Sequence, residues 1–209
     1  MNFPEPEIDE YLHQITPPSP EIIAEVEALA AERNFPIIGP LVGRVLYQLV
    51  KISKAKNVFE LGSGFGYSAL WIASAMPENG QMICTEFDKA KAEEGMRYLE
   101  RAKLMHKVIY EVGSALENFH RYQGPFDIIF CDIDKHEYPK ALELSVPKLK
   151  SGGLFLADNT LWSGRILDPD DKSRETQGIR QFNEKLFSDP RLFGSILPLR
   201  DGVGIGLKR

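Results

Sequence analysis

The sequence contains only two cysteines, Cys84 and Cys131, and each lies inside an apolar run. Small secreted domains that rely on disulfides are far richer in cysteine, so no disulfide framework is indicated. Cys and His residues also do not occur at the spacing of a zinc site. We therefore expect two buried thiols and a reducing, cytoplasmic environment.

Basic residues are not in excess, because 25 Lys and Arg stand against 30 Asp and Glu, a net charge of −5. Proteins that bind nucleic acid non-specifically cluster Lys and Arg, so no bulk nucleic-acid binding is expected. No apolar run reaches the ~18 residues of a membrane-spanning helix. Residues 1–11 lack the basic and apolar regions of a signal peptide, so no membrane association is expected.

What the chain does contain is a regular alternation of two residue patterns. Residues 16–34 and 40–53 have helical spacing with proline breaks, and Ser19 is the predicted N-cap before Pro20. From residue 57 onward, short apolar segments alternate with helical ones. The predicted strands are 57–62, 81–87, 107–113, 126–132, 152–159, 193–199 and 203–208. The predicted helices between them are 67–76, 91–104, 115–122, 138–149 and 176–189.

Five strand–helix steps followed by a hairpin predict an α/β fold. We expect a Rossmann-like, seven-stranded, mostly parallel sheet with helices on both faces and a C-terminal antiparallel hairpin turning at Asp201-Gly202. Residues 1–209 would form a single domain. Within it, the helical segment 1–50 would contribute to the substrate site or to a dimer interface. In such sheets ligands bind beyond the carboxyl ends of the strands.

A glycine-rich loop follows the first predicted strand, with glycines at 62, 64 and 66. Tyr67 stands where the dinucleotide fingerprint has its third glycine. Glu60 lies at the strand tip, where a carboxylate would repel a pyrophosphate and would suit a cationic or hydroxyl-bearing ligand. The loop therefore favours an amino-acid nucleoside over NAD, and a tight turn without a ligand is the alternative interpretation.

The second predicted strand ends at Glu86, where a ribose-binding acid is expected in this topology. Phe87 follows and could pack on a base. A solvent-facing strand end is the alternative interpretation of Glu86. Together with Glu60 and the glycine loop, however, the position favours a nucleoside ligand.

With these motifs the chain resembles the class I S-adenosylmethionine-dependent methyltransferases from about residue 20 onward. The resemblance implies that Glu60, the Gly62–Ser63 backbone and Ser68 hold the methionine part of the cofactor. It implies that Glu86 binds the ribose hydroxyls and that Ala115 lies near the adenine. A contact at Ile38, where plant relatives carry Thr, would be through the backbone.

Two neighbouring predicted strands end in polar residues, Asp132 on one and Asp158-Asn159 on the other. Adjacent parallel strands lie less than ~5 Å apart, so these oxygens should converge beside the glycine loop. Oxygen-only ligation favours a hard divalent ion, with Mg²⁺ first and Ca²⁺ or Mn²⁺ as alternatives. A helix cap or an Asx turn is the alternative interpretation of Asp158-Asn159.

The combination of "DIDK" at 132–135 with "DNTLWSG" at 158–164 resembles the cation-dependent O-methyltransferases. That group contains the caffeoyl-CoA and catechol O-methyltransferases. The resemblance implies metal ligands at Asp132, Asp158 and Asn159 and cofactor contacts at Asp132 and Asp134. It also implies that Lys135 is the general base and that the chain forms a homodimer.

The implied acceptor is a small phenol with a vicinal diol, such as a catechol. Trp162 and Ser163 would contact it, Ser163 standing where plant relatives carry Asn. The segment around 161–178 would be a mobile loop at the mouth of the site. A hydroxylated uridine of tRNA is the alternative acceptor. A nucleotide-binding oxidoreductase and a non-catalytic cofactor-binding module are the alternatives from other functional classes.

Overall fold

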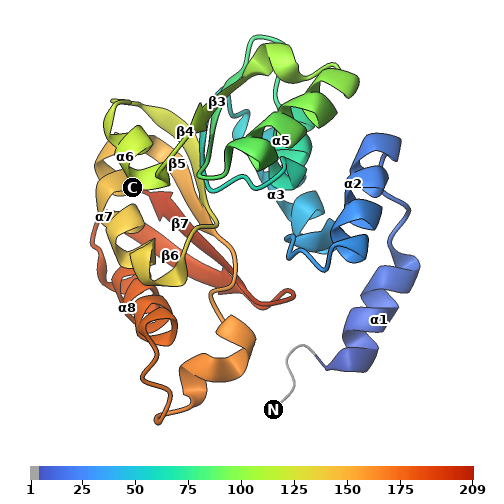
Figure 1. Ribbon diagram of the computed structural model, residues 1–209. Coiled ribbons are helices and arrows are strands. Elements are labelled where there is room, and N and C mark those ends of the chain that lie inside the picture. The colour runs from blue at the N-terminus through green and yellow to red at the C-terminus, as the bar shows by residue number, and fades with distance from the viewer. Residues whose placement is uncertain (1–4) are drawn as a thin grey trace.

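The structure is a computed structural model that describes residues 5–209. Seven strands form one sheet in the order β3-β2-β1-β4-β5-β7-β6 (Figure 1). The strands are β1 (Asn57–Leu61), β2 (Gln81–Glu86), β3 (Val108–Val112), β4 (Phe126–Cys131), β5 (Leu149–Ala157), β6 (Leu192–Leu197) and β7 (Val203–Lys208). The neighbours among β1 to β5 pair in parallel, whereas β7 is antiparallel to both β5 and β6. The predicted mostly parallel sheet with a C-terminal antiparallel hairpin is confirmed.

Helices cover both faces of this sheet (Figure 1). The α-helices are α1 (Pro6–Ile15), α2 (Glu21–Glu32), α3 (Gly39–Ser53), α4 (Tyr67–Ala75), α5 (Lys89–Arg101), α6 (Ala115–His120), α7 (Tyr138–Lys148) and α8 (Arg174–Ser188). Three short 3-10 segments are η1 (Met105–Lys107), η2 (Lys135–Glu137) and η3 (Trp162–Leu167). Within residues 5–209, no helix is both long and apolar enough to cross a lipid bilayer.

The apolar core is divided into two layers by the alternation of side chains along each strand. Val58 of β1 and Ile128 of β4 point to the face covered by α2 to α5. Their neighbours Phe59 and Ile129 point to the opposite face, which α6, α7 and α8 cover. Strands buried on both faces explain the near-continuous apolar runs of the sequence.

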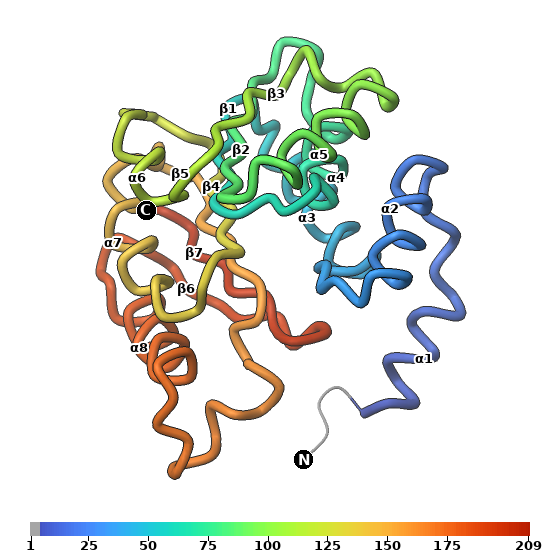
Figure 2. The backbone as a smooth tube through the Cα atoms, in the orientation of Figure 1, coloured from blue at the N-terminus to red at the C-terminus, as the bar shows by residue number. Residues whose placement is uncertain are grey.

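The N-terminal helices lie at one side of the molecule, with α1 at its outer edge beyond α2 (Figure 2). The predicted Ser19 N-cap is wrong. Helix α2 begins at Glu21 with Pro20 as its N-cap and no side-chain cap. The Ser19 hydroxyl instead donates to the Glu27 carboxylate, at 2.7 Å. Residues 1–4 of the predicted helical segment lie outside the described residues.

The β6–β7 connection is longer than the predicted two-residue turn at Asp201-Gly202. Leu197 pairs with Val203, so residues 198–202 form a five-residue loop. The difference has a physical cause in the contacts of Asp201. Its carboxylate accepts hydrogen bonds from Asn159 and Ser163, which ties this loop to the segment after β5.

Candidate active site

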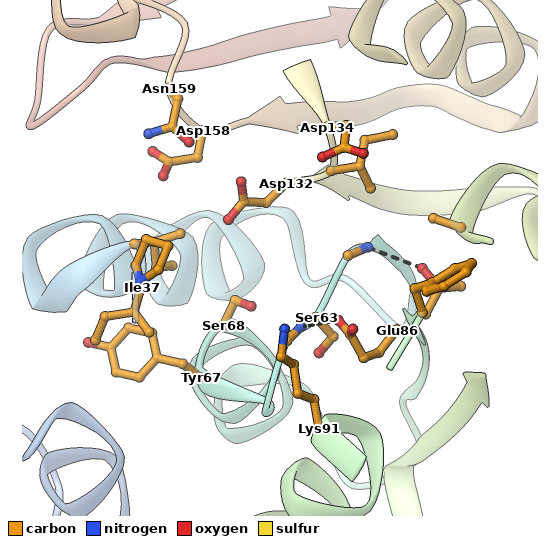
Figure 3. A pocket seen from close by; sticks show the side chains of 18 of the residues that line it. Ile37, Ser63, Tyr67, Ser68, Glu86, Lys91, Asp132, Asp134, Asp158 and Asn159 are labelled. Atoms are coloured by element: carbon orange, nitrogen blue, oxygen red, sulfur yellow. Dashed lines mark hydrogen bonds between the residues drawn. The ribbon is translucent and has the colours of Figure 1, made fainter. Parts of the chain in front are cut away.

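A cavity of about 730 Å³ opens at the carboxyl ends of β1, β2, β4 and β5 (Figure 3). This position follows the rule for open parallel sheets, because the strand order reverses between the adjacent strands β1 and β4. From β1 the chain continues to β2 on one side, and from β4 it continues to β5 on the other. Of the sequence-predicted site residues, all but Glu60 and Ser163 line it. Those that do are Ile38, Gly62, Ser63, Ser68, Glu86, Phe87, Ala115, Asp132, Asp134, Lys135, Asp158, Asn159 and Trp162.

The backbone N–H groups of the glycine loop are largely bonded within the protein. Gly62 donates to the Thr85 hydroxyl at 3.1 Å, and Ser63 to the Thr85 carbonyl at 2.9 Å. Gly64 donates to the Glu86 carboxylate at 2.9 Å. These three donors are therefore not free for a phosphate, unlike those of a loop that cradles a pyrophosphate. Glu86 lines the cavity while holding the loop, and so links the two parts of the predicted nucleoside site.

Glu60 lies beneath the loop rather than in the cavity, since its side chain is fully buried. The Ser68 hydroxyl, which does line the cavity, donates to Glu60 Oε1, whereas Oε2 has no hydrogen-bond partner. Burial raises the pKa of Glu60 to about 7, against the lowering effect of the bond from Ser68. Glu60 therefore lies behind Ser68 at the edge of the cavity, with one carboxylate oxygen left unpaired, and its predicted cofactor contact stays a prediction.

The adenine side of the predicted site is open. The Phe87 ring is 80% exposed at the cavity mouth and is available for stacking. Ala115 begins α6, which Ser114 caps by accepting from the Glu117 N–H. Ile38 is buried at the N-cap of α3, so a ligand would meet mainly the backbone of this segment.

Asp132, Asp158 and Asn159 form one wall of the cavity (Figure 3). They follow directly on the paired residues Cys131 and Ala157 of β4 and β5. The Asp158 side chain is 2% exposed, and its Oδ1 has no hydrogen-bond partner. Burial and the neighbouring Asp132 charge raise the pKa of Asp158 to about 7. An unpaired buried carboxylate oxygen beside a second carboxylate fits a cation.

The donor set is small and consists of oxygen alone. Asn159 donates its amide N–H to Asp201 at 3.0 Å, which leaves its amide oxygen as an acceptor. Within residues 5–209, no group of three His, Cys, Asp or Glu side chains is placed to hold a metal ion. Two carboxylates with one amide oxygen suit Mg²⁺, Ca²⁺ or Mn²⁺ better than zinc.

Lys135 projects into the same cavity from η2 and is only 12% exposed. Its Nζ donates to Asp132 Oδ1 at 2.7 Å, to the Ile133 carbonyl at 3.2 Å and to the Tyr138 hydroxyl at 2.9 Å. Burial raises the pKa of Tyr138 well above its ordinary value, so this hydroxyl stays protonated. The three contacts give the amine a fixed direction beside the acidic wall.

Hydrogen bonds to Lys135 or to the acidic wall come from three side chains that were not among the sequence predictions: Tyr138, Arg200 and Asp201. The Arg200 guanidinium donates to Asp158 Oδ2 at 2.9 Å, and Asp201 also accepts from the Ser163 backbone N–H. Asp201 had a signal in the sequence, but the Asp-Gly pair indicated only a turn. Arg200 and Tyr138 had none, because their approach depends on the packing of the hairpin loop and of α7.

The segment after Asn159 is more structured than the predicted mobile loop. Trp162 lines the cavity and donates its indole N–H to the Thr176 hydroxyl at 3.1 Å. Ser163 is exposed and does not line the cavity, so it is not placed as the expected acceptor contact. Asp171 accepts from Arg165 at 2.7 Å and from the Thr176 hydroxyl at 2.9 Å, which fastens the segment to the start of α8.

Comparison with known proteins assigns the family. Residues 15–209 match the family model described as O-methyltransferase. The chain is 31% identical over 198 residues to a catechol O-methyltransferase of Niastella koreensis, covering 92% of this chain and 90% of the relative. It is 32% identical to caffeoyl-CoA O-methyltransferase 2 of Populus trichocarpa, covering 90% and 82%. The fold matches an O-methyltransferase from Bacillus cereus in complex with SAH, with a TM-score of 0.88, 28% identity and 97% coverage of both chains. The chain therefore belongs to the O-methyltransferase family.

Proposed function

We propose that this protein transfers a methyl group from S-adenosylmethionine to a hydroxyl of a vicinal-diol, catechol-type phenol, with the help of a divalent cation. One observation carries the proposal. Asp132, Asp158 and Asn159 converge with Lys135 on one wall of a cavity whose other wall has the features of a nucleoside site. The relatives named for catechol and caffeoyl-CoA support this acceptor class.

The cofactor would bind along the glycine loop. The backbone N–H groups of this loop are already bonded within the protein. They therefore favour a ligand without a pyrophosphate, which argues against NAD. The unpaired Oε2 of Glu60 suits the ammonium group of the methionine part, and Glu86 suits the ribose hydroxyls. Phe87 and Ala115 flank the place of the adenine. The match to a structure in complex with SAH supports the same ligand class.

A divalent cation bound by Asp132, Asp158 and Asn159 would supply Lewis-acid polarisation of the acceptor hydroxyl. Lys135, as the free amine, would take the hydroxyl proton at Nζ. The acceptor oxygen would form a bond to the methyl carbon as the carbon–sulfur bond breaks, and the sulfur would keep that electron pair. The Ile133 carbonyl and the Tyr138 hydroxyl would keep the amine directed into the cavity.

The test is methyl transfer from labelled S-adenosylmethionine to a panel of phenols, with Mg²⁺ and with EDTA. We expect transfer to vicinal diols, loss of transfer with EDTA, and little transfer to phenols with a single hydroxyl. Full activity in EDTA would refute the cation assignment. Transfer to a hydroxylated tRNA uridine and to no phenol would refute the acceptor class. Stabilisation by NAD in place of S-adenosylhomocysteine would refute the cofactor.

A further inference from the structure

Arg200 occupies an unusual backbone position in the β6–β7 loop. Its φ is +50°, in the left-handed region where glycine and asparagine are the favoured residues. Residues held in this conformation cluster at functional sites, because the surrounding structure must compensate for the strain. Three further non-glycine residues with positive φ, namely Asn159, Trp162 and Ser163, lie in the neighbouring segment.

The side chain of Arg200 lines the cavity near the start of α3. Its Cδ would lie 3.9 Å from a Cβ added to Gly39, so the aliphatic part rests against the start of that helix. The guanidinium reaches Asp158, and the Arg200 side chain as a whole is 35% exposed. Within residues 5–209, Asp158 is the sole carboxylate in salt-bridge distance of Arg200. The charged end therefore stands directly beside the candidate cation site.

Arg200 also lines a second cavity of about 370 Å³, which adjoins the first. Its walls come mostly from apolar residues of α2 and of the segment between α2 and α3, namely Ala30, Ala31, Phe35, Pro36 and Ile37, together with Asn34. Glu27 lines it too, but its Oε1 accepts from the hydroxyls of Tyr67, at 2.6 Å, and Ser19, at 2.7 Å. Arg200 is thus the cationic group at the junction of two cavities.

The charges at this junction decide which ligand fits. A divalent cation at the acidic wall would balance the charges of Asp132 and Asp158, and so would weaken the one salt bridge that Arg200 makes within residues 5–209. A buried or half-buried guanidinium then favours a carboxylate, which it can bind with two parallel hydrogen bonds. We propose that Arg200 is a specificity-determining residue that binds a carboxylate on the phenolic acceptor, whose ring would lie against Ile37 and Pro36. The proposal rests on the proposed methyl transfer and names its acceptor class as catechol carboxylates.

The first experiment compares kcat/KM for catechols that differ in charge: protocatechuate and dihydroxyphenylpropionate, neutral methylcatechol and cationic dopamine. We expect at least one carboxylate to exceed methylcatechol by roughly tenfold, the scale of one charge-assisted contact that is partly exposed, and dopamine to be the poorest. Arg200→Gly should reduce the ratio of kcat/KM between the carboxylate and the neutral catechol to near unity, and Arg200→Lys should retain part of this preference. Glycine suits the left-handed backbone, so the variant should fold.

Arg191→Gln is the matched control, because Arg191 precedes β6 at the opposite end of the same strand and pairs with Asp189. It should leave the preference intact. A wild-type ratio near unity between carboxylate and neutral catechols would overturn the proposal. The same holds for a preference that survives in Arg200→Gly.

A second measurement keeps this proposal distinct from the proposed reaction. Binding of p-hydroxybenzoate and of p-cresol is measured by calorimetry on the full chain with S-adenosylhomocysteine and Mg²⁺. We expect the carboxylate to bind roughly tenfold more tightly, and this difference to vanish in Arg200→Gly. If no phenol is methylated but this difference is found, the carboxylate site stands and the reaction assignment fails. If catechols are methylated and no difference is found, the reaction stands and the role of Arg200 is refuted.

Discussion

Lys135 is the residue whose replacement should separate chemistry from binding. Its Nζ has three polar partners at the acidic wall, and among residues 5–209 no other lysine forms a salt bridge with Asp132. We expect Lys135→Ala to lower kcat by roughly 10²–10⁴-fold, the usual contribution of a general base, with Mg²⁺ affinity retained. Single-turnover kinetics and metal titration measure the two effects. Lys140→Ala, an exposed lysine on α7 paired with Glu143, is the control that should change neither. Full activity of Lys135→Ala would refute the base assignment.

Glu60 predicts a pH dependence of stability. Its folded pKa is raised by burial from 4.5 to about 7, so the folded state holds a proton that the unfolded state releases. The contribution of Glu60 to stability is therefore complete below pH 4.5 and is lost as the pH rises through 7. The side chain of Glu60→Gln stays neutral. In the protein without ligand, the free energy of unfolding of this variant should therefore rise relative to that of the wild type by up to about 3 kcal/mol between pH 5 and pH 8.

Thermal unfolding of both proteins at pH 5 and pH 8 measures this effect. Asp158 titrates in the same direction, but it is present in both proteins and cancels in the comparison. A stability difference that is equal at the two pH values would contradict the role of Glu60. S-adenosylhomocysteine should bind more weakly to Glu60→Gln, because the variant cannot offer a charged oxygen to an ammonium group.

The sequence predicted some of these residues and missed others for a physical reason. Asp132, Asp158 and Asn159 follow paired residues of adjacent parallel strands, so periodicity and topology together bring them to one edge. Arg200 reaches the same edge from the loop between β6 and β7. In the same loop, the Asp201 carboxylate accepts a hydrogen bond from the Asn159 side chain. Such contacts depend on loop path and side-chain direction, which no strand or helix pattern encodes.

At the scale of elements, the position of Lys135 depends on the packing of η2 against α8. A Cβ added to Gly178 of α8 would meet the backbone of Lys135 and His136 closer than any real contact allows. Alanine normally stabilises a helix by about 1 kcal/mol relative to glycine. Here we expect Gly178→Ala to lower the free energy of unfolding by roughly 1–3 kcal/mol instead, because the η2 backbone must shift.

The same variant should lower kcat by at least about tenfold, since small displacements of a catalytic group cost large factors in rate. Thermal unfolding and steady-state kinetics measure both effects. Gln181→Ala, an exposed position of the same helix, should be neutral in each. A Gly178→Ala protein that is more stable than the wild type would show that η2 does not depend on this contact.

From β1 onward the order and type of the elements were predictable, whereas helix α1 and the connections were not. The five strand–helix steps follow from alternating apolar segments, and the structure confirms them. The β6–β7 loop and η3 differ from expectation because both are shaped by side chains from elsewhere in the chain. Asp201 ties the loop to Asn159, and Asp171 fastens the end of η3 to α8.

At the scale of the whole molecule, exposed apolar side chains gather on two elements. On α1 they are Ile8, Tyr11 and Ile15, which share one helix face and are 55%, 56% and 57% exposed. On the β6–β7 hairpin they are Phe193, Leu197 and Leu207, which are 63%, 38% and 39% exposed. We propose that a second copy of the chain covers one or both surfaces, which gives the homodimer that the family resemblance implies.

Light scattering coupled to size exclusion tests this proposal. We expect a mass of about twice 23.6 kDa. Tyr11→Glu and Phe193→Glu should each be tested, and the variant that yields the monomer identifies the surface used. Gln48→Glu, an exposed change on α3 that also adds one negative charge, is the charge-matched control. A monomeric wild-type protein at micromolar concentration would refute the homodimer.

The strand of this sheet that comes last in sequence order is an interior strand, because β7 lies between β5 and β6. While the protein is being synthesised, β5 therefore has an unpaired edge until Val203–Lys208 has left the ribosome. Unpaired edges of this kind promote aggregation of incomplete chains. Arg200 and Asp201 emerge immediately before that strand. A nascent chain thus covers the edge of β5 and completes the surroundings of Asp158 and Asn159 in one and the same step.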